Sequence, residues 1–119
     1  MRYMTLVRSV EQVGPPPAEL MSAIASLGEE EIRSGKLVTT GGLGPTALST
    51  RLRLAGGHLT VTDGPFGEAK EVIGGFAIYE VASKVEAVAA ARRFLELHEA
   101  YWPGWEGEVE VRPVFGADQ

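Results

Sequence analysis

Residues 48–66 read LSTRLRLAGGHLTVTDGPF, and this stretch predicts a β-hairpin. The hairpin is the starting point for assigning the fold of the rest of the chain. Leucine or valine alternates with polar residues on both sides of Gly56-Gly57, which is the pattern of two half-buried strands. Two adjacent glycines can both adopt the positive φ angles of a two-residue turn. Pairing outward from that turn sets Leu54 opposite Leu59, so we expect apolar residues to meet on one face of the hairpin.

The segments on either side of the hairpin complete a βαββαβ order. We predict a first strand at residues 2–8, where β-forming residues alternate, and a helix from Pro17 to Ser34, where an apolar stripe recurs every three or four residues. A capping box at residues 83–86 starts a second helix. The other strands are expected at 36–42, 72–81 and 108–115. This order predicts an α+β, ferredoxin-like fold with an inserted β-hairpin.

The predicted sheet has one face that the chain itself does not cover. Two helices can pack on only one side of such a sheet, so the opposite side needs a partner. A second copy of the chain is the simplest candidate, and we therefore expect a homodimer. Pro113 lacks a backbone N–H, so the last strand is expected at an edge of the sheet.

Length, charge and composition exclude several classes of function. The chain has 119 residues, no cysteine and a formal net charge of −5, so we expect a single domain over residues 1–119 without thiol chemistry or cysteine-based metal sites. Scattered basic residues argue against nucleic-acid binding. No phosphate loop, dinucleotide fingerprint or metal-ligand set is present, so we expect no cofactor. No apolar run suits a membrane span or a signal peptide, which favours a cytoplasmic protein.

The end of the hairpin carries a specific motif. The segment Val61-Thr62-Asp63-Gly64-Pro65-Phe66 is followed by Glu68, Lys70, Glu71 and Gly74-Gly75-Phe76, and Glu110-Val111-Arg112-Pro113-Val114 lies near the end of the chain. Taken together, these elements resemble the YCII-related, or DGPF, family over nearly the whole length. The resemblance implies a bacterial protein with a ferredoxin-like fold that dimerises as a dimeric α+β barrel. It implies no generally assigned reaction.

One feature of the wider superfamily is missing. Several proteins of the superfamily that this chain resembles carry a histidine on the first helix, and this histidine is thought to pair with an aspartate as a catalytic dyad. The predicted first helix, residues 17–34, contains no histidine. The dyad therefore cannot be carried over to this chain, which weakens the case for an enzyme.

Asp63 is the first candidate catalytic residue. The hairpin register places it on the same face as Leu59 and Val61, and a carboxylate that continues a buried apolar stripe must be paired, hydrogen-bonded or neutral. Desolvation would favour its protonated form and suit it to acid/base chemistry. Alternatively, an aspartate that opens Asp-Gly-Pro-Phe can accept backbone N–H bonds and cap the turn. A ligand site here would draw on Gly64 for backbone conformation, Pro65 for rigidity and Phe66 as a wall.

His98 is the second candidate catalytic residue. It follows Val88, Ala91 and Leu95 on the expected inward line of the second helix, and Trp102 continues that line. A lone histidine on an apolar face is more often structural than catalytic, although its ordinary pKa lies near neutrality. Trp102 belongs to an aromatic cluster that either covers the end of the sheet or forms the wall of a small-molecule pocket.

Two charged residues and one charge run complete the candidates. Glu71 and Arg112 are expected binding residues, and Glu71 could pair with Arg112 or with Lys70. The run Glu29–Glu31 is interpreted as a solvated helix face, because consecutive helical residues point in different directions.

These residues support two main hypotheses about function. The first is a dimeric module that binds a small ligand or regulates a partner without catalysis. The alternative is a small-molecule enzyme that uses Asp63 as general acid or base in a pocket at the dimer barrel. A plainer third hypothesis is an assembly protein whose dimer is itself the functional object. No substrate class can be identified from these residues.

Overall fold

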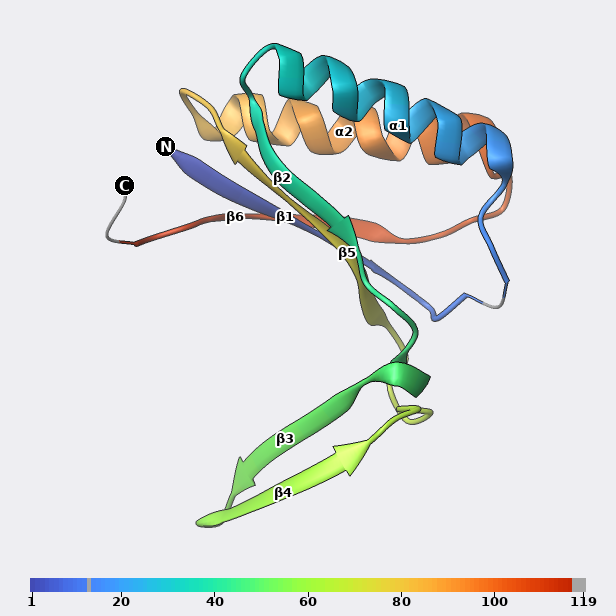
Figure 1. Ribbon diagram of the computed structural model, residues 1–119, viewed down its shortest axis with the longest axis vertical. Coiled ribbons are helices and arrows are strands. Elements are labelled where there is room, and N and C mark those ends of the chain that lie inside the picture. The colour runs from blue at the N-terminus through green and yellow to red at the C-terminus, as the bar shows by residue number, and fades with distance from the viewer. Residues whose placement is uncertain (13, 117–119) are drawn as a thin grey trace.

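The computed structural model describes residues 1–12 and 14–116 and shows one antiparallel sheet covered by two helices on one face (Figure 1). The sheet order is β2-β5-β1-β6, and its strands are β1 (Arg2–Ser9), β2 (Leu37–Gly42), β5 (Val72–Glu80) and β6 (Glu108–Pro113). The helices are α1 (Ala18–Arg33) and α2 (Lys84–Tyr101). All three strand pairs are antiparallel. The predicted α+β class is confirmed, and the arrangement is consistent with a ferredoxin-like fold.

The core lies between the sheet and the helices. Tyr3 and Tyr79 face each other across β1 and β5, and both are buried on the side that the helices cover. Leu20 of α1 is only 1% exposed. Helix α2 contributes mainly alanine to this core, with Ala87 and Ala90 buried. Pro113 ends β6 at an edge of the sheet, as its missing N–H predicts.

The inward line predicted for α2 is wrong at its start. Val88 is 39% exposed, whereas Ala87, Ala90, Ala91 and His98 are buried. The helix is rotated so that its alanine side chains face the sheet, which turns Val88 towards solvent. His98 stays on the buried side, as predicted.

The solvated face predicted for the acidic run of α1 is wrong for one of its three residues. Glu29 and Glu30 are exposed, but Glu31 is only 5% exposed. Successive helical residues are rotated by about 100°, so one carboxylate of the run turns inward. The Tyr79 hydroxyl donates a hydrogen bond to Glu31 Oε1 at 3.1 Å, and the guanidinium of Arg93 donates to Oε2 at 3.3 Å. The buried charge is therefore both paired and hydrogen-bonded.

The hairpin projects from the sheet on the side away from the helices (Figure 1). Its strands, β3 (Thr50–Ala55) and β4 (His58–Asp63), form a separate two-stranded sheet that we call the arm, residues 50–63. The predicted register is confirmed, with Leu54 opposite Leu59. The predicted burial of its apolar face is wrong for the single chain, because every residue of β4 is exposed.

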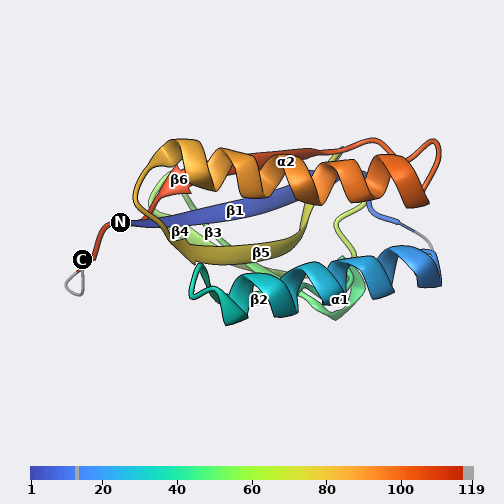
Figure 2. The same ribbon diagram turned by 90° about the horizontal axis from the view of Figure 1, so that it is seen from above.

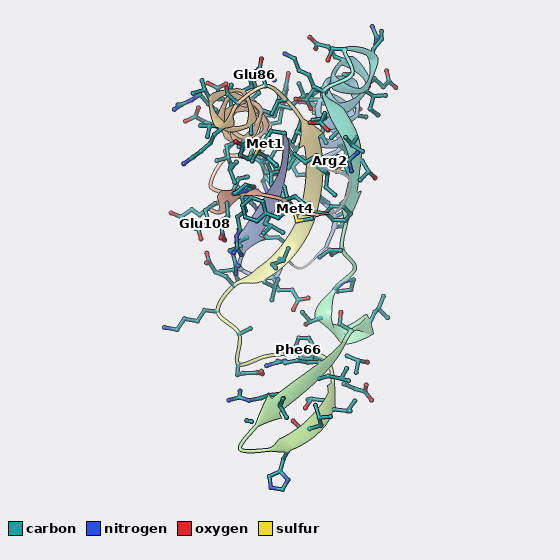
Figure 3. The ribbon with its side chains drawn as sticks, turned by 90° about the vertical axis from the view of Figure 1, so that its left-hand side faces the viewer. Met1, Arg2, Met4, Phe66, Glu86 and Glu108 are labelled. Atoms are coloured by element: carbon teal, nitrogen blue, oxygen red, sulfur yellow. The ribbon has the colours of Figure 1, made fainter. Side chains whose placement is uncertain are left out.

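Backbone and side-chain hydrogen bonds hold the base of the arm. The N–H of Gly64 donates to the Ser49 carbonyl at 2.8 Å, and the N–H of Phe66 donates to Thr46 Oγ1 at 3.2 Å. The Thr46 N–H and hydroxyl donate to the two carboxylate oxygens of Glu11, each at 2.6 Å. Figure 3 shows Phe66 at the junction between the arm and the rest of the chain. The base is thus tied to the segment that follows β1.

Candidate functional site

A cleft of about 710 Å³ lies between the helices and the sheet face that they cover. Seen from above, α1 and α2 lie on either side of β1 and β5 (Figure 2). Ile24 and Leu27 line the α1 side, Ala90 and Phe94 line the α2 side, and Val7 is among the sheet residues at the floor. The alanine-rich inner face of α2 fills little of the space between the two helices, which leaves a largely apolar cavity.

The two ends of the cleft carry different polar groups. Glu31 lines the cleft with Tyr79, which lies opposite Tyr3 near the start of β1. At the other end, His98 packs against Trp105, whose ring approaches the backbone near Arg8. Positions 3 and 8 of a strand are separated by roughly 16 Å, at about 3.3 Å for each residue. Glu31 and His98 therefore cannot exchange a proton directly.

His98 sits within an aromatic wall at its end of the cleft. Its ring centroid lies 4.6 Å from that of Phe94 and 4.3 Å from that of Trp105. Trp102 lies 6.2 Å from Trp105, between centroids, and completes this wall. These four residues all line the cleft. Of the aromatic cluster noted in the sequence after the second helix, Trp102 and Trp105 line the cavity, whereas Tyr101 does not.

The protonation state of His98 follows from burial and one hydrogen bond. Burial lowers the pKa of His98 below its ordinary value of 6.5, and the bond to the Phe94 carbonyl opposes this only in part. The ring is therefore neutral at pH 7. Nδ1 lies 3.0 Å from the Phe94 carbonyl oxygen, which can only accept, so Nδ1 carries the hydrogen. Nε2 keeps its lone pair and can accept a hydrogen bond from a ligand.

Asp63 and its motif lie outside this cleft. Asp63 is exposed at the end of β4, and Thr50 Oγ1 donates to its Oδ1 at 2.9 Å. The partner is thus a side chain on the neighbouring strand and not the backbone N–H that a turn cap predicts. Phe66 is half-buried beneath the Arg51 guanidinium, 4.1 Å from its ring centroid. Of the residues that the structure describes, those that line the cleft include none of residues 63–66.

The remaining predicted binding residues occupy separate places. Trp102 lines the cleft, whereas Glu71 is exposed just before β5. Arg112 projects from the sheet face that the helices leave open, and its Nε lies 3.7 Å from Glu110 Oε1. The ion pair of Arg112 seen here is therefore with Glu110. The structure does not bring the candidates together into one site.

Sequence reasoning missed Glu31 and Tyr79 as residues of the cleft. A signal for Glu31 was present, because it continues the spacing of Leu20, Ile24 and Leu27 by one further step of four. An acidic residue on an apolar helical stripe predicts a buried, paired carboxylate. The surrounding acidic run hides this signal.

Glu11 connects the cleft with the base of the arm, because it lines the cleft and accepts both bonds from Thr46. The Thr46 hydroxyl and then its N–H lower the pKa of Glu11 below the ordinary 4.5. A lowered folded-state pKa means that this contribution to stability is present above pH 4.5 and is lost as the pH falls through the lower value.

We expect acidification below pH 4.5 to loosen the base of the arm before the sheet unfolds. The measurement is the NMR chemical shift of the Thr46 amide during an acid titration, with Tyr79 as a reference within the sheet. The Thr46 amide should move with the protonation of Glu11, and the Glu11→Gln variant should abolish that movement. An identical titration in the variant would contradict the assignment.

Comparison with known proteins relates the chain to a family. The family model for the YCII-related domain matches residues 1–115. An uncharacterized protein of Rhizobium meliloti (strain 1021) is 33% identical over 95 residues, covering 80% of this chain and 73% of the relative. In the described part of the chain, no helix is long and apolar enough to cross a membrane, and no three acidic or histidine side chains cluster as metal ligands.

Proposed function

The chain belongs to the YCII-related family, and from that premise we propose that it is a homodimeric module that binds a small, mainly apolar molecule in its cleft. The cleft between the sheet and the helices carries the proposal. Its volume of about 710 Å³ falls within the roughly 300–1,000 Å³ that is typical of ligand pockets. An apolar lining with a few polar groups is also typical of such sites.

The lining indicates what kind of ligand would fit. The apolar side chains of both helices suit an elongated hydrocarbon or aromatic body. Nε2 of His98 suits a hydroxyl or amide donor at the aromatic end. At the other end, Glu31 is already neutralised by Arg93, so that end favours no strong charge on the ligand.

The homodimer is supported by the uncovered face of the sheet. Met4, Leu6, Phe76 and Ile78 project from β1 and β5 on the side opposite the buried tyrosines. A sheet with one apolar face left open needs cover, and a second copy provides the same surface in return. The expected dimeric α+β barrel is this arrangement of two sheets.

Acid/base catalysis by Asp63 in a pocket at the dimer barrel is the alternative. One observation favours it: Asp63 shares a face of the arm with Leu59 and Val61, so a partner that covered this face would also desolvate the carboxylate. Turnover that disappears in Asp63→Asn, with the fold and the dimer intact, would establish this role. A ligand that stabilises the protein without product formation supports binding instead.

The test of the cleft uses N-phenyl-1-naphthylamine, a neutral apolar dye that brightens when it leaves water. We expect it to bind the wild-type protein and to quench the fluorescence of Trp102 and Trp105 by energy transfer. Ile24→Trp places a large ring in the cleft and should weaken binding about tenfold or more.

The matched control is Ala25→Trp, which adds the same ring one residue away on the exposed side of α1. It should leave the affinity for the dye unchanged. Equal affinities for Ile24→Trp and the wild type would show that the dye binds elsewhere and would remove the main support for the cleft as the binding site.

A further inference from the structure

The arm leaves one apolar face uncovered in the single chain. Its four side chains on that face are 67% to 72% exposed: Leu52, Leu54, Leu59 and Val61. They form two opposed pairs across the strands, so the apolar surface is continuous. An isolated two-stranded hairpin is at best marginally stable in water, and a contiguous exposed apolar patch marks an interaction surface.

Hydrogen bonds and one ion pair hold the base of the arm. The N–H of Gly64 donates to the Ser49 carbonyl at 2.8 Å, and the N–H of Thr46 donates to the Glu11 carboxylate at 2.6 Å. Beside them, Arg51 covers the Phe66 ring and forms an ion pair with Glu68. In this arrangement the apolar face of the arm is exposed in the single chain, so a second molecule is needed to cover it.

The open face of the sheet lies on the same side of the molecule as the arm (Figure 1). Around its apolar centre are charges of both signs, including the ion pairs Arg8–Glu110 at 3.2 Å and Arg2–Glu80 at 3.3 Å. A rim of mixed sign does not suit a uniformly anionic surface such as a nucleic acid or an acidic membrane. It does suit the same rim on a second copy related by a two-fold axis, because each copy then offers charges of both signs to the other.

The open sheet face alone is too small for a stable dimer interface, which indicates that the arm is also part of the interface. Four strands about 4.8 Å apart and about 20 Å long give the open sheet a flat area of roughly 400 Å². A standard interface buries about 800 Å² on each partner, so the sheet face alone falls short. The two-stranded arm adds roughly 200 Å². Side chains enlarge the accessible area beyond the flat area, which brings the combined surface close to the standard size.

We propose that the open sheet faces of two copies contact each other in a two-fold dimer, and that the arm of each copy extends this contact by packing its apolar face against the partner's sheet. This inference rests on the homodimer proposed above and adds the segment that holds it together. Because Asp63 lies on the apolar face of the arm, this dimer would place its carboxylate against the partner subunit.

The first experiment measures the dimer dissociation constant by analytical ultracentrifugation. The double substitution Leu54→Ser with Leu59→Ser removes one opposed apolar pair and is expected to raise the dissociation constant about 100-fold. The matched control is Arg53→Ser with Thr60→Ser, the opposed pair on the other face of the arm, which should leave the constant nearly unchanged. Circular dichroism confirms that both variants keep the main sheet.

The second experiment locates the contact. The chain contains no cysteine, so Thr60→Cys introduces a single site for a nitroxide spin label on the polar face of the arm. Mixed with an isotope-labelled wild-type copy, the label is expected to broaden amide signals of the partner at Met4, Leu6, Phe76 and Ile78. A label at Ser26→Cys, on the exposed side of α1, should leave these signals sharp.

The outcomes separate the two proposals. A wild-type chain that stays monomeric at millimolar concentration would overturn the homodimer and the role of the arm together. A wild-type dimer that tolerates the leucine substitutions, or whose broadened amides lie on the helices, would overturn only the role of the arm. Binding of a monomeric chain to lipid vesicles through the arm would assign this face to a membrane and also overturn the inference.

Discussion

Replacing Gly64 with alanine is expected to lower the free energy of unfolding by about 3 kcal/mol, at the upper end of the range for overpacked substitutions. A Cβ atom at this position would lie 1.6 Å from the Thr46 carbonyl oxygen and 3.3 Å from the Ser49 carbonyl oxygen. The nearer of these is a backbone atom that no side-chain rotation can move. The chain must therefore separate Gly64 from Thr46, which disrupts the hydrogen bonds at the base of the arm.

Urea denaturation measures the loss of stability, and amide hydrogen exchange at Phe66 reports on the base of the arm directly. Gly67→Ala is the matched control, because a Cβ at Gly67 meets nothing within 4 Å. That variant should be neutral or slightly more stable, since alanine reduces the freedom of the unfolded chain. Equal stability of the two variants would mean that Gly64 does not pack against Thr46.

The arm shows what the sequence can and cannot predict about this fold. Its register follows from local features, because the Gly56-Gly57 turn fixes which residues face each other and the side-chain period of a strand is two. Its burial depends on which distant surface covers it, and no pattern within the hairpin contains that information. The pattern therefore predicts the face on which Asp63 lies, but not its exposure in the single chain.

The cleft was not predictable for a related reason. Periodicity identified Ile24 and Leu27 as inward residues of α1, and they do point inward. Whether an inward residue fills a core or lines a cavity depends on the residue opposite it. Here the facing helix offers Ala90 and Ala91, whose short side chains leave the space open. The periodicity of a helix predicts which of its faces points inward. The distance between two helices depends instead on how the helices and the sheet pack together.

The buried carboxylate supports a second strong prediction. We expect Glu31→Ala to cost about 2–4 kcal/mol in free energy of unfolding, because it leaves the buried Tyr79 hydroxyl without its acceptor and Arg93 without its partner. This loss in free energy of unfolding is smaller than that expected for a fully buried ion pair, because Arg93 is 44% exposed and its guanidinium can turn to water. Glu30→Ala, an exposed change of the same charge one residue away, should stay within about 0.5 kcal/mol of the wild type.

The same pair also predicts how stability depends on alkaline pH. Burial, and next the nearby Glu31 carboxylate, raise the pKa of Tyr79 above its ordinary 10.0. A raised folded-state pKa means that this contribution to stability is full below pH 10 and is lost as the pH rises beyond it. Removing the carboxylate lowers the folded-state pKa of Tyr79 towards 10, so the alkaline loss of stability should be shallower in Glu31→Ala than in Glu30→Ala. Urea titrations of both variants between pH 9 and 12 measure the difference, because burial alone keeps the Tyr79 pKa raised and the curves separate only at the alkaline end. Parallel curves up to pH 12 would show that Glu31 does not act on the Tyr79 hydroxyl.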